Sequence, residues 1–291
     1  MKKCFLTLLF SPFFFAYSQE TSLLGEIKDS AKTTEKIFST FKSTRVINAH
    51  SVEMLHKGNL DFRILHRFGF LSEGAKQFFG LDQASMRMSF DYGISDNFTV
   101  GIGRSTLRKE LDAFVKTRLL QQSTGQKNIP LSLVVAAGAM VWTEKSFAAV
   151  KPDFTDRSAY YVQLLAGRKF NDKFSLQLSP ILVHSNLPIS GTEKNIIGLG
   201  GGARYKFSRR MAFTIDYHHA MNGLTDQNTN PLSVGVDIET GGHVFQLHFS
   251  NATGMNERAY LTETYGDFFK GDIRFGFNLS RIFQVGHRKL N

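Results

Sequence analysis

From Leu60 almost to the C-terminus, apolar and polar residues alternate along the chain with a period of two. Leu60, Phe62 and Ile64 alternate with Asp61 and Arg63. Successive side chains of a strand point to opposite faces of a sheet, so this pattern predicts a series of half-buried strands rather than helices. We count twelve such strands, centred on residues 60–64, 86–92, 98–102, 111–115, 131–135, 160–164, 174–178, 197–207, 211–217, 232–238, 244–250 and 273–279.

The connections between these strands alternate between tight turns and longer loops. Tight turns are predicted at residues 95–97, 171–173, 208–210 and 240–242, and longer loops at 70–84, 144–157, 185–194, 222–231 and 252–271. Bacterial outer-membrane barrels have an even number of antiparallel strands, short periplasmic turns and long external loops. Two connections depart from the pattern, because residues 107–109 are short on the long-loop side and residues 123–128 are long on the turn side.

A soluble sandwich would show the same alternation, so strand length and strand ends decide between the two folds. The segments run to about ten residues, the length that crosses a bilayer at a tilt. Lipid offers no hydrogen-bond partner to an open sheet edge, so the sheet has to close. We therefore expect an all-β, antiparallel transmembrane β-barrel of about 12 strands. Aromatic residues are expected to form two girdles at interfacial depth: Phe98, Phe170, Phe174, Phe207 and Phe283 on the turn side, and Tyr160, Tyr217 and Phe249 on the loop side.

The first 58 residues differ from the rest of the chain. Residues 1–18 have a basic start, an apolar stretch and a small-x-small cleavage site, which together predict a signal peptide. The only cysteine, Cys4, lies within it, so thiol chemistry and cysteine-bound zinc are not expected in the exported chain. Residues 19–58 are predicted as a short N-terminal periplasmic segment, and residues 59–291 as the outer-membrane barrel.

The net charge and the hydropathy of the chain limit which partners and which kind of membrane-spanning segment are expected. The formal net charge is +10, and losing Lys2 and Lys3 with the signal peptide leaves 33 basic against 25 acidic residues, a net charge of +8. Export makes nucleic acid the least expected partner, whereas lipopolysaccharide is compatible with basic outer loops. The longest nearly apolar run, residues 131–142, is too short for a membrane-spanning helix of roughly 20 residues.

If apolar side chains face lipid, the intervening polar side chains line the barrel interior. Eight predicted interior cations face seven interior anions, which suggests ion-pair networks. A twelve-stranded barrel lies between the small barrels filled by their own side chains and the wide porins, so the sequence leaves open whether the lumen is open or plugged. The candidate lumen-lining residues are Arg63, Arg67, Arg87, Asp91, Asp112, Lys116, Arg118, Arg204, Asp216, His218 and Arg274.

One short motif suggests catalysis. His248, Ser250 and Asn251 follow the order H-x-S-N, which is similar to the catalytic strand of outer-membrane lipid hydrolases. Those enzymes need the pair facing the membrane, whereas Phe245, Leu247 and Phe249 should face lipid here and turn His248 and Ser250 inward. Lumen residues followed by a turn-forming Asn251 are therefore the favoured interpretation.

Two further motifs have structural interpretations. The glycine-rich residues 198–202 precede no helix and place three glycines on the interior face, so they indicate a small-residue stripe rather than a phosphate loop. His218 and His219 point to opposite faces, and no matching ligand lies near them in the sequence, so neither a metal site nor another cofactor is expected.

Four short segments carry a family resemblance: residues 57–64 (KGNLDFRI), 66–69 (HRFG), 243–247 (HVFQL) leading to Ser250 and Asn251, and 275–281 (FGFNLSR). With these, the chain resembles the small outer-membrane β-barrels of the Bacteroidota, and in particular an uncharacterised family of such barrels. The resemblance covers most of the exported chain. It implies an architecture, the outer membrane of a Gram-negative bacterium as location, and contact with the barrel-assembly machinery. Eight residues follow Phe283, whereas such barrels typically end on an aromatic residue.

Three functions are compatible with this fold. The first is a narrow channel or binding barrel for a small polar solute, selected by the lumen charges. The second is a lipid hydrolase that uses His248 and Ser250. The third is a structural anchor for a periplasmic or surface partner. The sequence does not identify the solute or the oligomeric state.

Overall fold

The computed structural model describes residues 33–147 and 150–286. The predicted signal peptide and residues 19–32 lie outside the described residues. Twelve strands form one closed antiparallel barrel, in the order β10-β11-β12-β13-β14-β2-β3-β4-β5-β7-β8-β9, which confirms the predicted fold class and strand number. The barrel strands are β2 (Asn59–Phe70), β3 (Ala84–Ser95), β4 (Phe98–Ser105), β5 (Leu111–Leu120), β7 (Ser132–Val141), β8 (Ser158–Lys169), β9 (Phe174–Ser185), β10 (Asn195–Lys206), β11 (Met211–Ala220), β12 (Leu232–Thr240), β13 (His243–Ser250) and β14 (Arg274–Gln284).

The two faces of the strands differ as the alternation predicts. On β9, Ser175, Gln177 and Ser179 point inward and are buried, while Leu176 and Leu178 are exposed on the outer face. Such an arrangement exposes apolar side chains and encloses polar ones, which suits a wall surrounded by lipid. Among the described residues, no helix has the length and apolar character needed to span a membrane.

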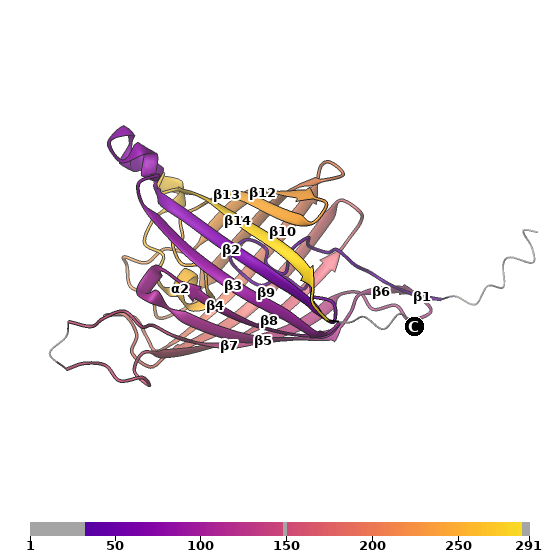
Figure 1. Ribbon diagram of the computed structural model, residues 1–291, viewed down its shortest axis with the longest axis horizontal. Coiled ribbons are helices and arrows are strands. Elements are labelled where there is room, and N and C mark those ends of the chain that lie inside the picture. Colours follow the sequence, from indigo (N-terminus) through magenta and orange to yellow (C-terminus); the bar gives the residue numbers. More distant parts are fainter. Residues whose placement is uncertain (1–32, 148–149, 287–291) are drawn as a thin grey trace, which may run out of the picture. The chain divides into compact units, whose positions relative to one another are not determined.

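The two ends of the barrel carry different connections (Figure 1). One end has the tight turns, together with the small sheet formed by β1 (Thr34–Lys36) and β6 (Ser123–Gly125). The opposite end carries the long loops, including the 3-10 helices η2 (Leu71–Glu73) and η3 (Ala75–Gly80) after β2, and α2 (Glu257–Thr262) between β13 and β14. Both exceptions in connection length are present, as η4 (Leu107–Lys109) on the loop end and β6 on the turn end. Because short turns of outer-membrane barrels face the periplasm, we call the end with the tight turns the periplasmic end and the end with the long loops the outer end.

The segment before the barrel lies in a different place from the one predicted, while β2 begins at Asn59. Residues 19–58 were expected on the periplasmic side, but residues 40–52 are nearly all buried. Residues 37–58 enter the barrel after β1 and return to the periplasmic end where β2 begins. The reason is physical: the interior presents polar groups on almost every strand, and this segment supplies the backbone and side-chain partners that those groups require.

Candidate functional site: the closed lumen

The barrel interior is occupied by residues 37–58, which we call the plug. It is a hairpin: Arg45 and His50 form an antiparallel bridge, and the Val46 amide donates to the Ala49 carbonyl at 2.9 Å. Both ends of the hairpin are held at the periplasmic end of the barrel. The Ile37 amide donates to Gln122 in the β5–β7 turn, and the Lys57 amide donates to Asp96 in the β3–β4 turn. The chain therefore enters and leaves the lumen on the same side.

A single carboxylate holds the tip of the plug. Asp216 Oδ2, on β11, accepts hydrogen bonds from the amides of Ile47, Asn48 and Ala49 at 3.2, 2.7 and 3.0 Å. Asp216 is 2% exposed, so these charge-assisted bonds form in a low-dielectric interior and are stronger than neutral hydrogen bonds. Asp216 thus acts as the anchor of the tip.

Wall side chains also bind the plug backbone elsewhere. Gln246 donates to the Val46 carbonyl at 2.6 Å, Asn278 to the Ile47 carbonyl at 2.9 Å, and Gln177 to the His50 carbonyl at 2.8 Å. Lys116 Nζ donates to the Glu53 carbonyl at 2.6 Å and to that of Thr44 at 3.4 Å. These side chains come from β5, β9, β13 and β14, so the plug is bonded around much of the barrel.

The glycine stripe on β10 is explained by what lies against it. A Cβ atom on Gly202 would come within 3.0 Å of Val46 of the plug, and one on Gly198 within 3.1 Å of Leu261. Gly200 lies beneath the His218 and Ser179 side chains. All three positions face inward, as the sequence predicts. Gly198 and Gly202 leave space for the inserted loop and the plug, and Gly200 leaves space for the wall side chains His218 and Ser179.

The outer half of the lumen is filled by residues 251–266, which we call the inserted loop. It carries α2, whose residues are all buried. Arg258 donates to both carboxylate oxygens of Glu110, at 2.8 and 3.0 Å, and also pairs with Glu263. Burial alone would lower the pKa of Arg258, but Glu110 and Glu263 raise it, so the cation persists in the interior. This arrangement ties the loop to the outer end of β5.

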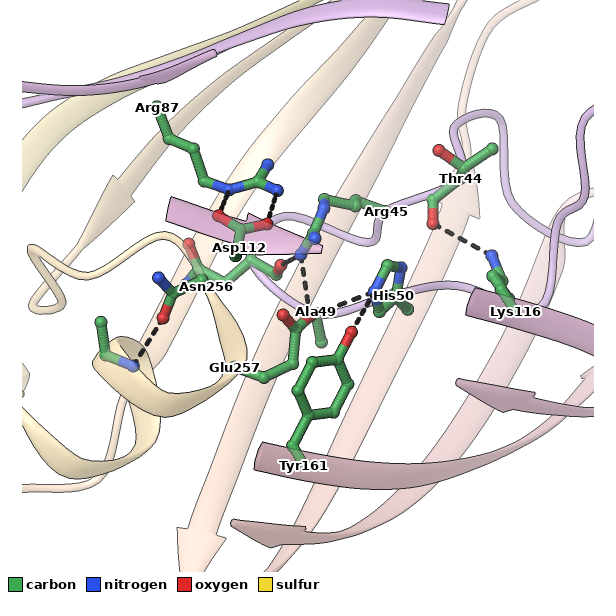
Figure 2. Close-up of polar contacts among 12 residues, drawn as sticks. Thr44, Arg45, Ala49, His50, Arg87, Asp112, Lys116, Tyr161, Asn256 and Glu257 are labelled. Carbon is green, nitrogen blue, oxygen red and sulfur yellow. Dashed lines mark hydrogen bonds and ion pairs between the residues drawn. The ribbon is translucent and has the colours of Figure 1, made fainter. Parts of the chain in front are cut away.

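The plug and the inserted loop meet at an ion pair in the middle of the lumen (Figure 2). Arg45 Nη1 lies 2.9 Å from Glu257 Oε1 and 2.5 Å from the Asn48 carbonyl oxygen. Both ionic side chains are about 98% buried or more. Burial opposes the charged form of Arg45, and the neighbouring Glu257 outweighs it and raises the pKa of the guanidinium. One ion pair therefore joins the plug, which enters at the end with the tight turns, to the inserted loop, which enters at the end with the long loops.

His50 lies beside this pair. Its Nε2 atom is 3.0 Å from the Tyr161 hydroxyl and 3.5 Å from Glu257. Burial and the nearby cations Arg45, Lys116, Arg87 and Arg63 keep the pKa of His50 well below its ordinary value. The imidazole is therefore neutral at neutral pH.

The structure places most of the predicted lumen residues in this interior network. Arg63 pairs with Asp61 at 2.5 Å and also donates to Ser43 and Thr44 of the plug. Arg67 donates to Asn48 at 2.8 Å. Buried inward side chains are those of Arg63, Arg67, Arg87, Asp91, Asp112, Lys116, Arg204, Asp216 and His218, while Arg118 and Arg274 are only partly buried near the two ends.

The H-x-S-N residues do not form a catalytic pair. Ser250 Oγ accepts a hydrogen bond from the Ser233 hydroxyl at 2.7 Å, and neither ring nitrogen of His248 has a hydrogen-bond partner among the described residues. Both side chains point inward and are about 99% buried or more. Asn251 stabilises the start of the inserted loop by bonding the Leu232 amide and the Gly266 carbonyl. Within the described chain, no three His, Cys, Asp or Glu side chains are grouped to hold a metal ion.

The sequence did not identify the residues at the centre of the site: Arg45, His50, Glu110, Glu257 and Arg258. They lie in segments interpreted as periplasmic or external, where charged residues are ordinary. The apolar residues next to Glu257 and Arg258 did indicate that this loop is buried. Met255, Ala259 and Tyr260 recur at helical spacing in a supposed external loop, and all three are buried.

A polar pocket remains open beside the plug at the periplasmic end. It measures about 370 Å³, and its walls come from the plug, from β2 and from the β12–β13 turn. Lys42 pairs there with Glu239 at 2.7 Å. The charged residues that line it are Lys42, Glu53, Asp61, Arg63 and Glu239.

Several solved structures have similar folds at very low sequence identity. The KdgM porin is 10% identical, with 77% of this chain and 99% of that chain covered and a TM-score of 0.45. The CymD monoaromatic hydrocarbon channel is 8% identical, with coverage of 81% and 90% and a TM-score of 0.39. Omp33 of Acinetobacter baumannii is 8% identical, with coverage of 78% and 99% and a TM-score of 0.39.

No curated protein sequence matches the chain. A family model does match it, over residues 41–283, which include the plug from Phe41 onward as well as the barrel strands. The match spans well over half of the sequence. The chain therefore belongs to the family described as "Membrane bound beta barrel domain (DUF5777)".

Proposed function

We propose that this protein is a gated, narrow channel of the bacterial outer membrane for a small polar solute, held closed by its own plug together with the inserted loop. The observation that carries the proposal is the path of residues 37–58. Both ends of this hairpin lie at the periplasmic end, so it can withdraw without breaking a wall strand or threading the chain. The wall behind it carries charged and amide side chains, which suit a water-filled passage once the plug, and with it the inserted loop that Arg45 holds through Glu257, has moved.

A reversible crosslink tests this gate. An ideal Cβ on Gly202 lies 3.6 Å from the Val46 Cβ, within the separation that a disulfide spans. The double variant Val46→Cys/Gly202→Cys joins the plug to β10, and Cys4 is the only native cysteine. In planar bilayers we expect opening events in the wild type and in the reduced variant, and none in the oxidised variant.

The two single-cysteine variants are the matched controls, because each carries the same substitution without a partner. Neither should respond to oxidant. Identical conductance in the oxidised and reduced double variant would overturn the gate, as would a wild type that never opens under any voltage or solute condition.

Further parts of the proposal concern surroundings and origin. Export through the periplasm, contact with lipopolysaccharide and recognition by the barrel-assembly machinery accord with a membrane-bound barrel, as does an origin in the Bacteroidota. A periplasmic partner would find β1 at the periplasmic end, directly before the plug. We propose no catalytic activity, since Ser250 bonds Ser233 rather than His248.

A further inference from the structure

Arg45 presents one side of its guanidinium group to no protein acceptor. Its Nη1 atom is occupied by Glu257 and the Asn48 carbonyl, whereas Nε and Nη2 have no hydrogen-bond partner in residues 33–147 and 150–286. The residue is 1% exposed. Buried polar atoms in folded proteins are nearly always bonded, so two unpartnered N–H groups on one cation call for a specific explanation.

Arg87 shows what this side of a guanidinium group binds. Its Nε and Nη2 atoms donate to the two carboxylate oxygens of Asp112, at 2.9 and 2.5 Å. This parallel pair of hydrogen bonds matches the spacing of the two oxygens of a carboxylate. Arg45 offers the same pair of atoms, and no carboxylate of the described chain lies against them.

Other unpartnered groups gather on the adjacent wall. Ser89 on β3 lies between Arg63 on β2 and Gly103 on β4 in the strand register. Arg63 Nε, Arg87 Nη1, Ser89 Oγ, Thr99 Oγ1 and Asp91 Oδ1 are buried and lack a hydrogen-bond partner within the described ranges. Of these five atoms, two belong to N–H groups, two to hydroxyls, and one is a carboxylate oxygen. Donors therefore predominate, and a solute bound in this sector of the lumen would be held chiefly through its own acceptor atoms.

The periplasmic pocket leads toward this sector. Its lining includes Thr44, the residue before Arg45, and also Arg63. Arg63 is fully buried, and its Nη atoms hold Ser43 and Thr44 of the plug. The pocket therefore reaches Arg63, one of the cations with an unpartnered N–H group, and ends one residue before Arg45 along the plug.

We propose that the lumen binds a small monocarboxylate, held by Nε and Nη2 of Arg45 as Asp112 is held by Arg87. This inference rests on the proposed solute channel and names the chemical class of its solute. A dianion such as phosphate fits less well, because Asp91, Asp112 and Glu257 lie in the same part of the lumen. Arg45 is thus both the partner of Glu257 and the solute-binding residue of the closed state.

Equilibrium binding of radiolabelled formate to the full-length protein in detergent tests the site. Arg45→Lys keeps the positive charge beside Glu257 but cannot offer two parallel N–H groups, so we expect affinity to fall at least tenfold. Asp91→Asn removes a nearby negative charge, so we expect affinity to rise several-fold. A misfolded lumen would not tighten binding. Lys270→Gln, on an exposed outer loop, is the control and should bind as the wild type does.

Formate binding that is absent from the wild type, or unchanged by Arg45→Lys, would overturn the site and leave only water at these atoms. Phosphate competing as well as acetate would overturn the monocarboxylate assignment. The assay needs no conduction, so its outcome is independent of the crosslinking experiment. Arg45-dependent binding together with a gate that fails the crosslinking test would identify a binding barrel rather than a channel.

Discussion

At the scale of single residues, closure of the lumen depends on a few side chains that bond to plug backbone. Asp216 is the most concentrated case, because one carboxylate oxygen accepts three amide hydrogens from consecutive residues of the tip. Asp237 on the neighbouring strand is about as buried, yet its partners are the wall residues Thr214, Gln246 and Arg204. Substituting each aspartate in turn therefore distinguishes an effect on the plug from the general effect of removing a buried charge.

We expect Asp216→Asn to loosen the plug while leaving the barrel closed around it. The amide keeps the shape but loses the charge that strengthens the three hydrogen bonds, at a cost of about 2 kcal/mol. Labelling of a Val46→Cys reporter by a thiol reagent should then be roughly thirtyfold faster. Asp237→Asn is the matched control. Equal labelling rates in both variants would show that Asp216 is not the anchor.

His50 predicts how closure depends on pH. Its pKa is held well below 6.5 in the closed lumen by burial and by Arg45, Lys116, Arg87 and Arg63, and these effects outweigh Glu257 at 3.5 Å. The Tyr161 hydroxyl is the remaining titratable neighbour. A withdrawn plug exposes His50 with an ordinary pKa, so only the open state takes up a proton as the pH falls below about 6.5. Closure is therefore fully stable above that pH and is weakened below it.

At pH 5, about 1.5 units below the ordinary value, this linkage favours the open state by about 2 kcal/mol. Open probability in planar bilayers should rise between pH 7.5 and pH 5. The variant His50→Gln keeps a polar group that can form hydrogen bonds but has no titratable ring, so it stays neutral in both states and should lose this part of the pH response. A response of the same size in His50→Gln would assign the effect to other groups.

At the scale of elements, the sequence was sufficient to predict the strands of the barrel wall but not the placement of the plug and the inserted loop in the lumen. Period-two alternation and turn length fix each strand and the side facing lipid, because a one-residue slip would turn charges such as Arg63 and Arg87 into the membrane. These are constraints within one segment. They predicted twelve strands, and they also predicted the two unusual connections at residues 107–109 and 123–128.

The plug and the inserted loop are different, because their places depend on partners far along the chain. Asn48 bonds Ser233, and Arg45 bonds Glu257, 212 residues away. Neither segment has a period that records such contacts, and polar residues at these positions are equally consistent with solvent. In the plug the unused signal was composition: Phe41, Val46 and Ile47 are apolar residues in a segment interpreted as periplasmic, and each is at least 98% buried.

At the scale of the whole molecule, the barrel wall contributes to stability in a different way from the plug and the inserted loop that fill the lumen. Each wall strand is hydrogen-bonded to two neighbours around a closed ring, so the barrel has no free edge whether or not the lumen is filled. Several wall charges are also paired within the wall, as Arg87 is with Asp112 and Arg63 with Asp61. Lumen charges that lose a plug partner would meet water, in which an unpaired charge is not costly.

Deleting residues 37–55 should therefore leave a folded barrel. We expect a larger conductance, because the plug is gone and Glu257 of the inserted loop has lost its partner Arg45. We expect the variant to insert into the membrane, to migrate as a compact species on gels without boiling and to change mobility after boiling. Its conductance should be steadier than that of the wild type, since no plug is left to enter and leave the lumen. Removing residues 75–80 from an outer loop should change neither the conductance nor its gating. A deletion variant that fails to insert would mean that the plug is needed for the ring to close, so that opening could involve only a partial shift of the tip from Asp216.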